Sequence, residues 1–114
     1  MSKQLSLISE LNFSADQLGL RSAELARILG LHCDDVSDSE QLEIRLDYDQ
    51  IIHHKAERVI ALYHLLKKKF NGNSVDMVSW IRKPQTALST TPFLSIVDHA
   101  GLEEVIALLQ QKTS

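Results

Sequence analysis

The histidines and the single cysteine are the side chains here with the widest chemical range, because both types bind metals and take part in proton or acyl transfer. The five histidines are scattered, and no two are four residues apart, the spacing that places two ligands on one helix face. His53 and His54 are adjacent, so on a helix they would point about 100° apart and could not chelate one ion. Cys33 is alone, which excludes an intrachain disulfide and a Cys-rich metal framework. We therefore expect no metal site.

The sequence also contains no pattern typical of a catalytic site. Cys33 has no base at a recognisable spacing, and the chain contains no Gly-rich phosphate loop and no nucleophile elbow. A helical chain of 114 residues also offers little room for a substrate pocket. We expect no catalytic residue, no cofactor and no enzymatic activity.

The two halves of the chain differ in net charge. Residues 1–50 carry four Lys/Arg against ten Asp/Glu, whereas residues 51–114 carry eight against five, and the formal net charge is −3. This balance argues against a general nucleic-acid binder, which would normally be basic. The acidic and basic halves could attract each other within one molecule or between copies. Lys67, Lys68 and Lys69 are the candidates for phosphate contact if the chain meets DNA, but they are equally typical of a solvated helix end.

The elements that must position any site are helices. The clearest pattern runs from Ile51 to Phe70, where apolar residues recur at i, i+3, i+4, i+7 and i+11 as Val59, Leu62, Tyr63, Leu66 and Phe70. Ser74 is expected to cap a following helix that reaches about Ile81, with Val75, Val78 and Ile81 facing inward. The core is completed by apolar residues nearer the C-terminus: Ile96, Val97, Leu102, Val105, Leu108 and Leu109.

The first fifty residues predict shorter helices. Leu5–Leu11 is amphipathic, and Ser14 with Gln17 forms a capping-box pattern that would start another helix. Ser22–Leu29 reads as a helix that Gly30 ends. Residues 37–50 form an acidic joint, either a helix or an extended linker.

The stretch from Trp80 to Gly101 contains both prolines. Pro84 lacks an N–H and disfavours helical geometry at Lys83, so the helix that carries Trp80 should end there. Thr91 can cap a new helix whose first residue is Pro92. Gly101 can take the left-handed conformation that closes this helix, and Leu102 to Gln111 begins another.

This stretch resembles the toxin-binding domain of Xre/MbcA/ParS-type antitoxins, bacterial proteins that pair with NAD-consuming RES-domain toxins. The similarity runs from about Arg58 to Leu109, roughly half the chain. It is carried by Trp80-Ile81, Pro84, Leu88, Thr91-Pro92, Gly101, Val105 and Leu109. The family usually has Asn where this chain has Gln85, and glycine where it has Ser89-Thr90.

The phrase Ser22–Leu31 is similar to the second helix of an Xre-type helix-turn-helix. Such a motif needs a following helix that meets phosphates in the major groove. Here the next residues are acidic, with no Lys or Arg before Arg45. We therefore expect a module with the shape of a DNA-binding domain but without the positive charge that contact with phosphates requires.

The fold expected is all-α, with an N-terminal helical, helix-turn-helix-like module over residues 1–50 and an antitoxin-type domain over residues 51–114. The resemblance implies an antitoxin of a type II toxin–antitoxin system, cytoplasmic and homodimeric through its N-terminal helices, that sterically blocks a RES-domain toxin. Alternatives are a DNA-binding autorepressor and an orphan protein-binding domain of the same fold. No membrane segment is expected.

The resemblance also assigns residues. It implies toxin contacts from the loop and the C-terminus: Arg82, Lys83, Gln85, Leu88, Thr91, Gln110, Gln111, Lys112 and Ser114. It implies scaffold roles for Trp80, Pro84, Pro92 and Gly101.

Overall fold

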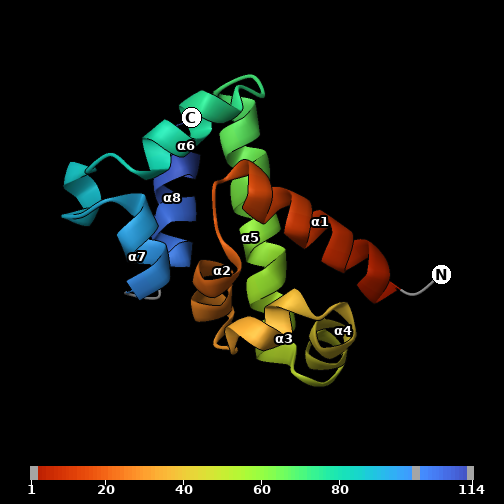
Figure 1. Cartoon of the computed structure of the whole chain (residues 1–114). Coiled ribbons are helices and arrows are strands. Elements are labelled where there is room, and N and C mark those ends of the chain that lie inside the picture. Colours follow the sequence, from red (N-terminus) through yellow and green to blue (C-terminus); the bar gives the residue numbers. More distant parts are fainter. Residues whose placement is uncertain (1–2, 99–100, 113–114) are drawn as a thin grey trace.

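The chain folds into helices arranged around one long central helix, α5 (Figure 1). The computed structural model describes residues 3–98 and 101–112, with side-chain surroundings for all of these except 3–6, 39, 111 and 112. Their elements are α1 (Lys3–Gln17), α2 (Ser22–Leu29), α3 (Cys33–Ser37), α4 (Ser39–Tyr48), α5 (Gln50–Lys69), α6 (Ser74–Ile81), the 3-10 turn η1 (Thr86–Leu88), α7 (Pro92–Asp98) and α8 (Leu102–Lys112). No strand occurs within the described residues, so the all-α prediction is confirmed.

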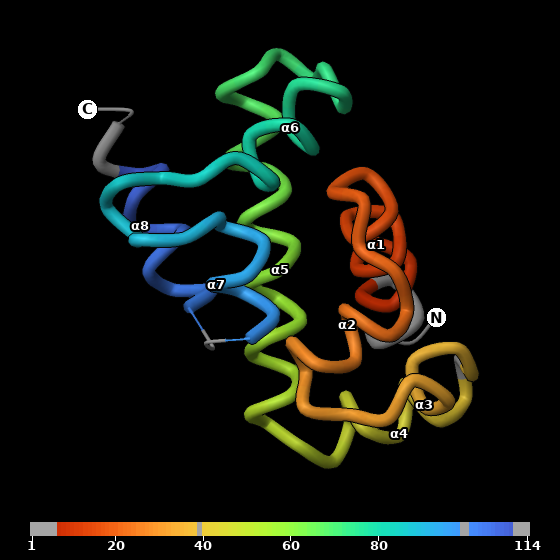
Figure 2. Tube along the Cα trace, turned by 60° about the vertical axis from the view of Figure 1, so that its left-hand side comes forward, coloured from red at the N-terminus to blue at the C-terminus, as the bar shows by residue number. Residues whose placement is uncertain are grey.

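Helix α5 is central because it is apolar around much of its circumference. It contacts α1, α2 and α4 from the first half of the chain, and α6 and α8 from the second. Figure 2 shows α8 on one side of it and α1 and α2 on the other, with α6 at its end. The predicted face is confirmed, with Val59, Leu62, Tyr63 and Leu66 buried and Phe70 half-buried. Ile60 is buried as well, as expected for a helix covered on more than one side.

The prediction that a new helix starts at Ser14 is wrong. Helix α1 runs without a break from Lys3 to Gln17, and Ser14 is buried within it. The apolar stripe Ile8, Leu11, Ala15 and Leu18 continues across Ser14 at helical spacing and is buried. Burial of that stripe outweighs the weak local preference of Ser14 for a cap.

Short polar side chains cap the N-termini of α4, α5 and α6. Asp38 caps α4, accepting from the N–H of Glu40 at 3.0 Å, and Asp49 caps α5, accepting from the N–H of Ile51 at 3.0 Å. Residues 39–48 are therefore helical, the first of the two predicted options. Asn73, not Ser74, caps α6 by accepting from the N–H of Asp76 at 3.2 Å.

The two halves of the chain share one hydrophobic cluster, to which α1, α2, α4, α5, α6, α7 and α8 all contribute buried residues. Helix α2 packs on α7, and Arg27 forms an ion pair with Asp98 across that contact. The boundary between two domains at residue 50 stays a prediction.

No helix among the described residues is long and apolar enough to span a bilayer.

Gly101 is required for a different reason from the one predicted. Its φ lies outside the left-handed region, which Gly19, Gly30 and Gly72 adopt. Instead, its N–H donates to the Ser95 carbonyl at 2.7 Å. A Cβ on Gly101 would lie 2.1 Å from Ser95 Oγ and 3.0 Å from Ser95 O. The missing side chain thus lets the start of α8 lie directly against α7.

Candidate protein-binding surface

The segment that follows α6 is anchored where it begins. Helix α6 ends at Ile81, close to the predicted stop before Pro84. The Arg82 guanidinium lies 4.3 Å from the centre of the Phe93 ring, and its Nη2 donates to the Gly19 carbonyl at 3.2 Å. Arg82 therefore ties the loop to α7 and to the turn after α1. Its predicted toxin contact stays a prediction.

The loop then closes on itself. The Gln85 N–H donates to the Thr90 carbonyl at 3.0 Å, and the Gln85 carbonyl accepts from the N–H groups of Leu88 and Ser89 at 3.0 and 3.1 Å. Between them Ser89 takes a left-handed conformation with φ of 59°. A side chain makes this conformation unfavourable, so glycine would adopt it at a lower cost than Ser89 does.

The loop is fixed again where it ends. The Thr91 Oγ1 accepts from the Leu94 N–H at 3.1 Å, and Pro92 is the first residue of α7. The predicted Thr-Pro helix start is confirmed. Pro92 and Trp80 are buried, whereas Pro84 is exposed.

Turn η1 lies beside α8, so the loop and the last helix share one surface. Between them is a hollow of about 260 Å³ lined by Ala87, Leu88, Glu104, Ala107 and Leu108. Leu108 was expected in the core, but it is only half-buried, at the edge of this hollow. The buried face of α8 is formed by Leu102, Val105, Ile106 and Leu109.

Of the predicted contact residues, Leu88 lines this hollow. Lys83 and Gln110 are exposed, and Gln85 and Leu88 are half-buried. Gln111 and Lys112 belong to α8 by their backbone, but their side chains lie outside the description, as does the whole of Ser114. The hollow itself adds Ala87, Glu104 and Ala107, none of which the motif indicated.

The predicted phosphate-contacting lysines lie at the far end of α5. Lys67, Lys68 and Lys69 are all exposed, and the Lys69 Nζ lies 5.5 Å from the centre of the Phe70 ring. Arg58, on the same helix, is held by Glu103 through two hydrogen bonds of 2.8 and 3.0 Å. Arg58 is therefore already paired within the chain, and DNA contact by the three lysines stays a prediction.

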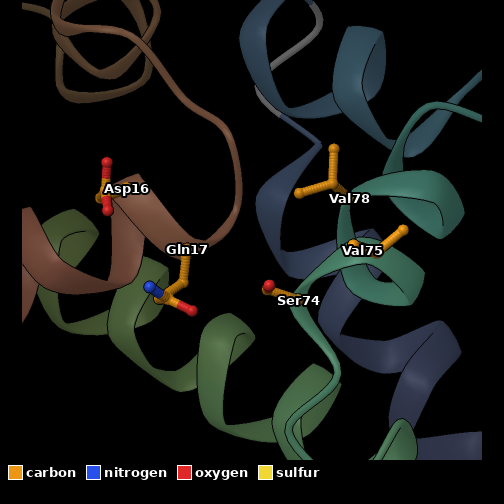
Figure 3. Close-up of a pocket in the computed structure, with 5 residues that line it drawn as sticks. All are labelled: Asp16, Gln17, Ser74, Val75 and Val78. Carbon is orange, nitrogen blue, oxygen red and sulfur yellow. The ribbon is translucent and has the colours of Figure 1, made fainter.

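A larger hollow of about 460 Å³ lies between the end of α1 and the start of α6 (Figure 3). Asp16 and Gln17 line one side, and Ser74, Val75 and Val78 line the other. Val75 was predicted to face inward but is 75% exposed, because Met77 takes the buried position on α6. Within residues 3–98 and 101–112, no group of three His, Cys, Asp or Glu side chains could hold a metal ion.

No protein-family model matches the chain, and no curated protein matches it significantly.

Proposed function

We propose that this protein is an antitoxin that binds a RES-domain toxin through the loop of residues 82–91 and helix α8. The observation that supports this most is the loop itself. It carries the residues of the antitoxin motif, it is tied down at both ends, and it lies against α8 around an open hollow.

The restraint of the loop matters for affinity. A flexible segment loses conformational entropy when a partner orders it, whereas a segment ordered by its own chain has already lost that entropy on folding. Here the loop is ordered by three interactions of its own chain: the Arg82 contacts, the Gln85–Thr90 hydrogen bond and the Thr91 cap. A nanomolar complex, about −12 kcal/mol, is attainable for a surface of this kind.

The proposed mechanism is steric and needs no chemistry from this chain. The end of α8 and the adjoining loop would cover the entrance to the toxin's active site and keep NAD out. As the resemblance implies, this would occur in the cytoplasm, with the antitoxin a homodimer through its N-terminal helices.

Recovery of partners from the native host tests the proposal. Tagged full-length chain is expected to retain a RES-domain protein and to inhibit its NAD consumption. A copy lacking residues 110–114 should inhibit much less. Recovery of an unrelated protein without any RES-domain protein would contradict the toxin assignment. Recovery of DNA whose binding falls steeply with salt would favour the autorepressor instead.

Matched alanine-to-arginine variants test the surface. Ala87→Arg and Ala107→Arg place a long cation in the hollow, and both alanines are exposed, so the fold should persist. Both are expected to weaken inhibition at least tenfold. Ala23→Arg, at an exposed position on α2, is the control and should inhibit normally. Equal inhibition by all three variants would exclude the loop–α8 surface as the contact.

A further inference from the structure

Helix α4 is apolar on two opposite faces. Leu42 and Leu46 are buried at 0% and 2% exposure, which fixes the inward face. Ile44 lies on the outward face at 46% exposure, with Tyr48 one turn further along at 86%. A surface helix normally carries polar residues opposite its buried stripe.

A third exposed apolar side chain follows three residues after Tyr48, at the start of the next helix. Ile51, in the first turn of α5, is 68% exposed. We call Ile44, Tyr48 and Ile51 the α4 ridge. These are three of the six large apolar side chains that are exposed in the part of the chain that the structure describes. A cluster of exposed apolar side chains with polar residues around it is typical of a binding surface.

Carboxylates border the α4 ridge. Glu40 and Asp47 lie four residues before and three residues after Ile44, which places both beside it on the outward face, and both are exposed. Asp49, exposed between Tyr48 and Ile51, adds a third. Arg45 is turned toward Asp35, with Nη2 and Oδ2 3.9 Å apart. The border around Ile44 and Tyr48 is therefore negative, whereas Lys55 adds one positive charge four residues after Ile51.

The negative charge beside Ile44 and Tyr48 indicates which kind of partner the α4 ridge can bind. A second copy of the chain seated ridge to ridge would bring the same carboxylates into opposition, which is unfavourable. Nucleic acid and anionic membranes are disfavoured by the same charge. We propose that the α4 ridge binds a basic amphipathic helix of another protein, with apolar side chains against Ile44, Tyr48 and Ile51 and lysines or arginines beside the carboxylates.

This surface is separate from the one proposed for the toxin. Helix α4 lies at the beginning of α5, whereas the loop and α6 lie toward the other end of that helix (Figures 1 and 2). The inference does not depend on the antitoxin proposal, since it requires only the burial pattern and charge of α4.

A synthetic helical peptide of leucine and lysine, with leucines at i, i+3, i+4 and i+7, is the probe. Titrated into isotopically labelled full-length chain, it is expected to give saturable NMR shifts centred on residues 40–51. A peptide of the same composition in scrambled order should bind at least tenfold more weakly. Shifts spread over all acidic surfaces, or equal binding of the scrambled peptide, would overturn the proposal.

Variants of the ridge separate its apolar and charged parts. The double variant Ile44→Ser/Tyr48→Ser should lose at least tenfold in affinity for the peptide. Val75→Ser removes another exposed apolar side chain, on α6, and should bind as the parent chain does. Glu40→Lys/Asp47→Lys should weaken binding and reduce its dependence on salt. Unchanged affinity for the peptide in the Ile44→Ser/Tyr48→Ser variant would overturn the proposal. Sedimentation tests the other occupant: if the parent chain self-associates and this variant does not, the ridge binds a second copy of the chain and the proposal is wrong.

Discussion

The loop–α8 surface and the α4 ridge expose their residues for different reasons. The loop is ordered by backbone restraints: two prolines, a left-handed serine and hydrogen bonds that close it on itself. The ridge lies on α4 and the first turn of α5, and it is distinguished only by apolar side chains that the fold leaves uncovered. A surface of the first kind is recognisable from the order of prolines and caps, whereas the second emerges only when the inward face of the helix is known.

The largest expected effect separates the two faces of α4. Leu46→Ala should lower the free energy of unfolding by about 2–5 kcal/mol, because it opens a cavity in the core. Ile44→Ala, on the ridge, should change it by less than about 0.5 kcal/mol. Urea denaturation of both variants measures the difference. A similar loss from the two would mean that the ridge is not an exposed face.

The support of the loop–α8 surface depends on Gly101. Gly101→Ala should destabilise the protein by about 1–3 kcal/mol, because the new Cβ meets Ser95 Oγ and the Ser95 backbone. Adding Ser95→Ala removes the nearest atom and should recover part of the loss, whereas the carbonyl contact remains. Urea denaturation of the single and double variants tests this. If Gly101→Ala is as stable as the parent chain, α7 and α8 are not in close contact there.

The anchoring of the loop by Arg82 can be isolated with a double-mutant cycle. Arg82→Ala and Phe93→Leu should show a coupling of about 0.5–1 kcal/mol, the usual magnitude for an exposed cation–ring contact. Lys83→Ala, the change of an exposed neighbouring cation, should show no coupling with Phe93→Leu. Equal coupling for the two cations would rule out a specific contact with Arg82.

The smallest expected effect is a stabilisation. Ser89→Gly should raise the free energy of unfolding by about 0.5–1 kcal/mol, because glycine adopts a φ of 59° without steric cost. Its flexibility in the unfolded chain offsets part of the gain. Ser89→Ala is the control and should show no gain, since it retains a Cβ. Thermal denaturation of both variants gives the sign, and a loss of stability in Ser89→Gly would show that the hydroxyl holds the turn.

Sequence patterns predicted the elements whose determinants are local. The stripe through Val59 and Leu66, the stop before Pro84 and the start at Thr91-Pro92 each depend on neighbours in the chain, and each is confirmed. The break at Ser14 failed because the burial of Leu11 and Leu18 against other helices decides the course of α1.

The remaining errors have the same origin. Gly101 was expected to adopt a left-handed turn, but its role is set by contact with Ser95 on the preceding helix. Val75 and Leu108 were assigned to the core from periodicity, which cannot tell whether a further helix covers that side. The hollow beside α8 and the α4 ridge were missed because each depends on which faces remain open after packing.

Hydrogen–deuterium exchange of the chain, alone and bound to a RES-domain protein, tests most directly whether the loop–α8 surface is the toxin contact. We predict slower exchange on binding at residues 83–90 and in α8, with exchange in α4 unchanged. Slowing confined to α2, α3 and α4, with none in the loop or α8, would contradict the account.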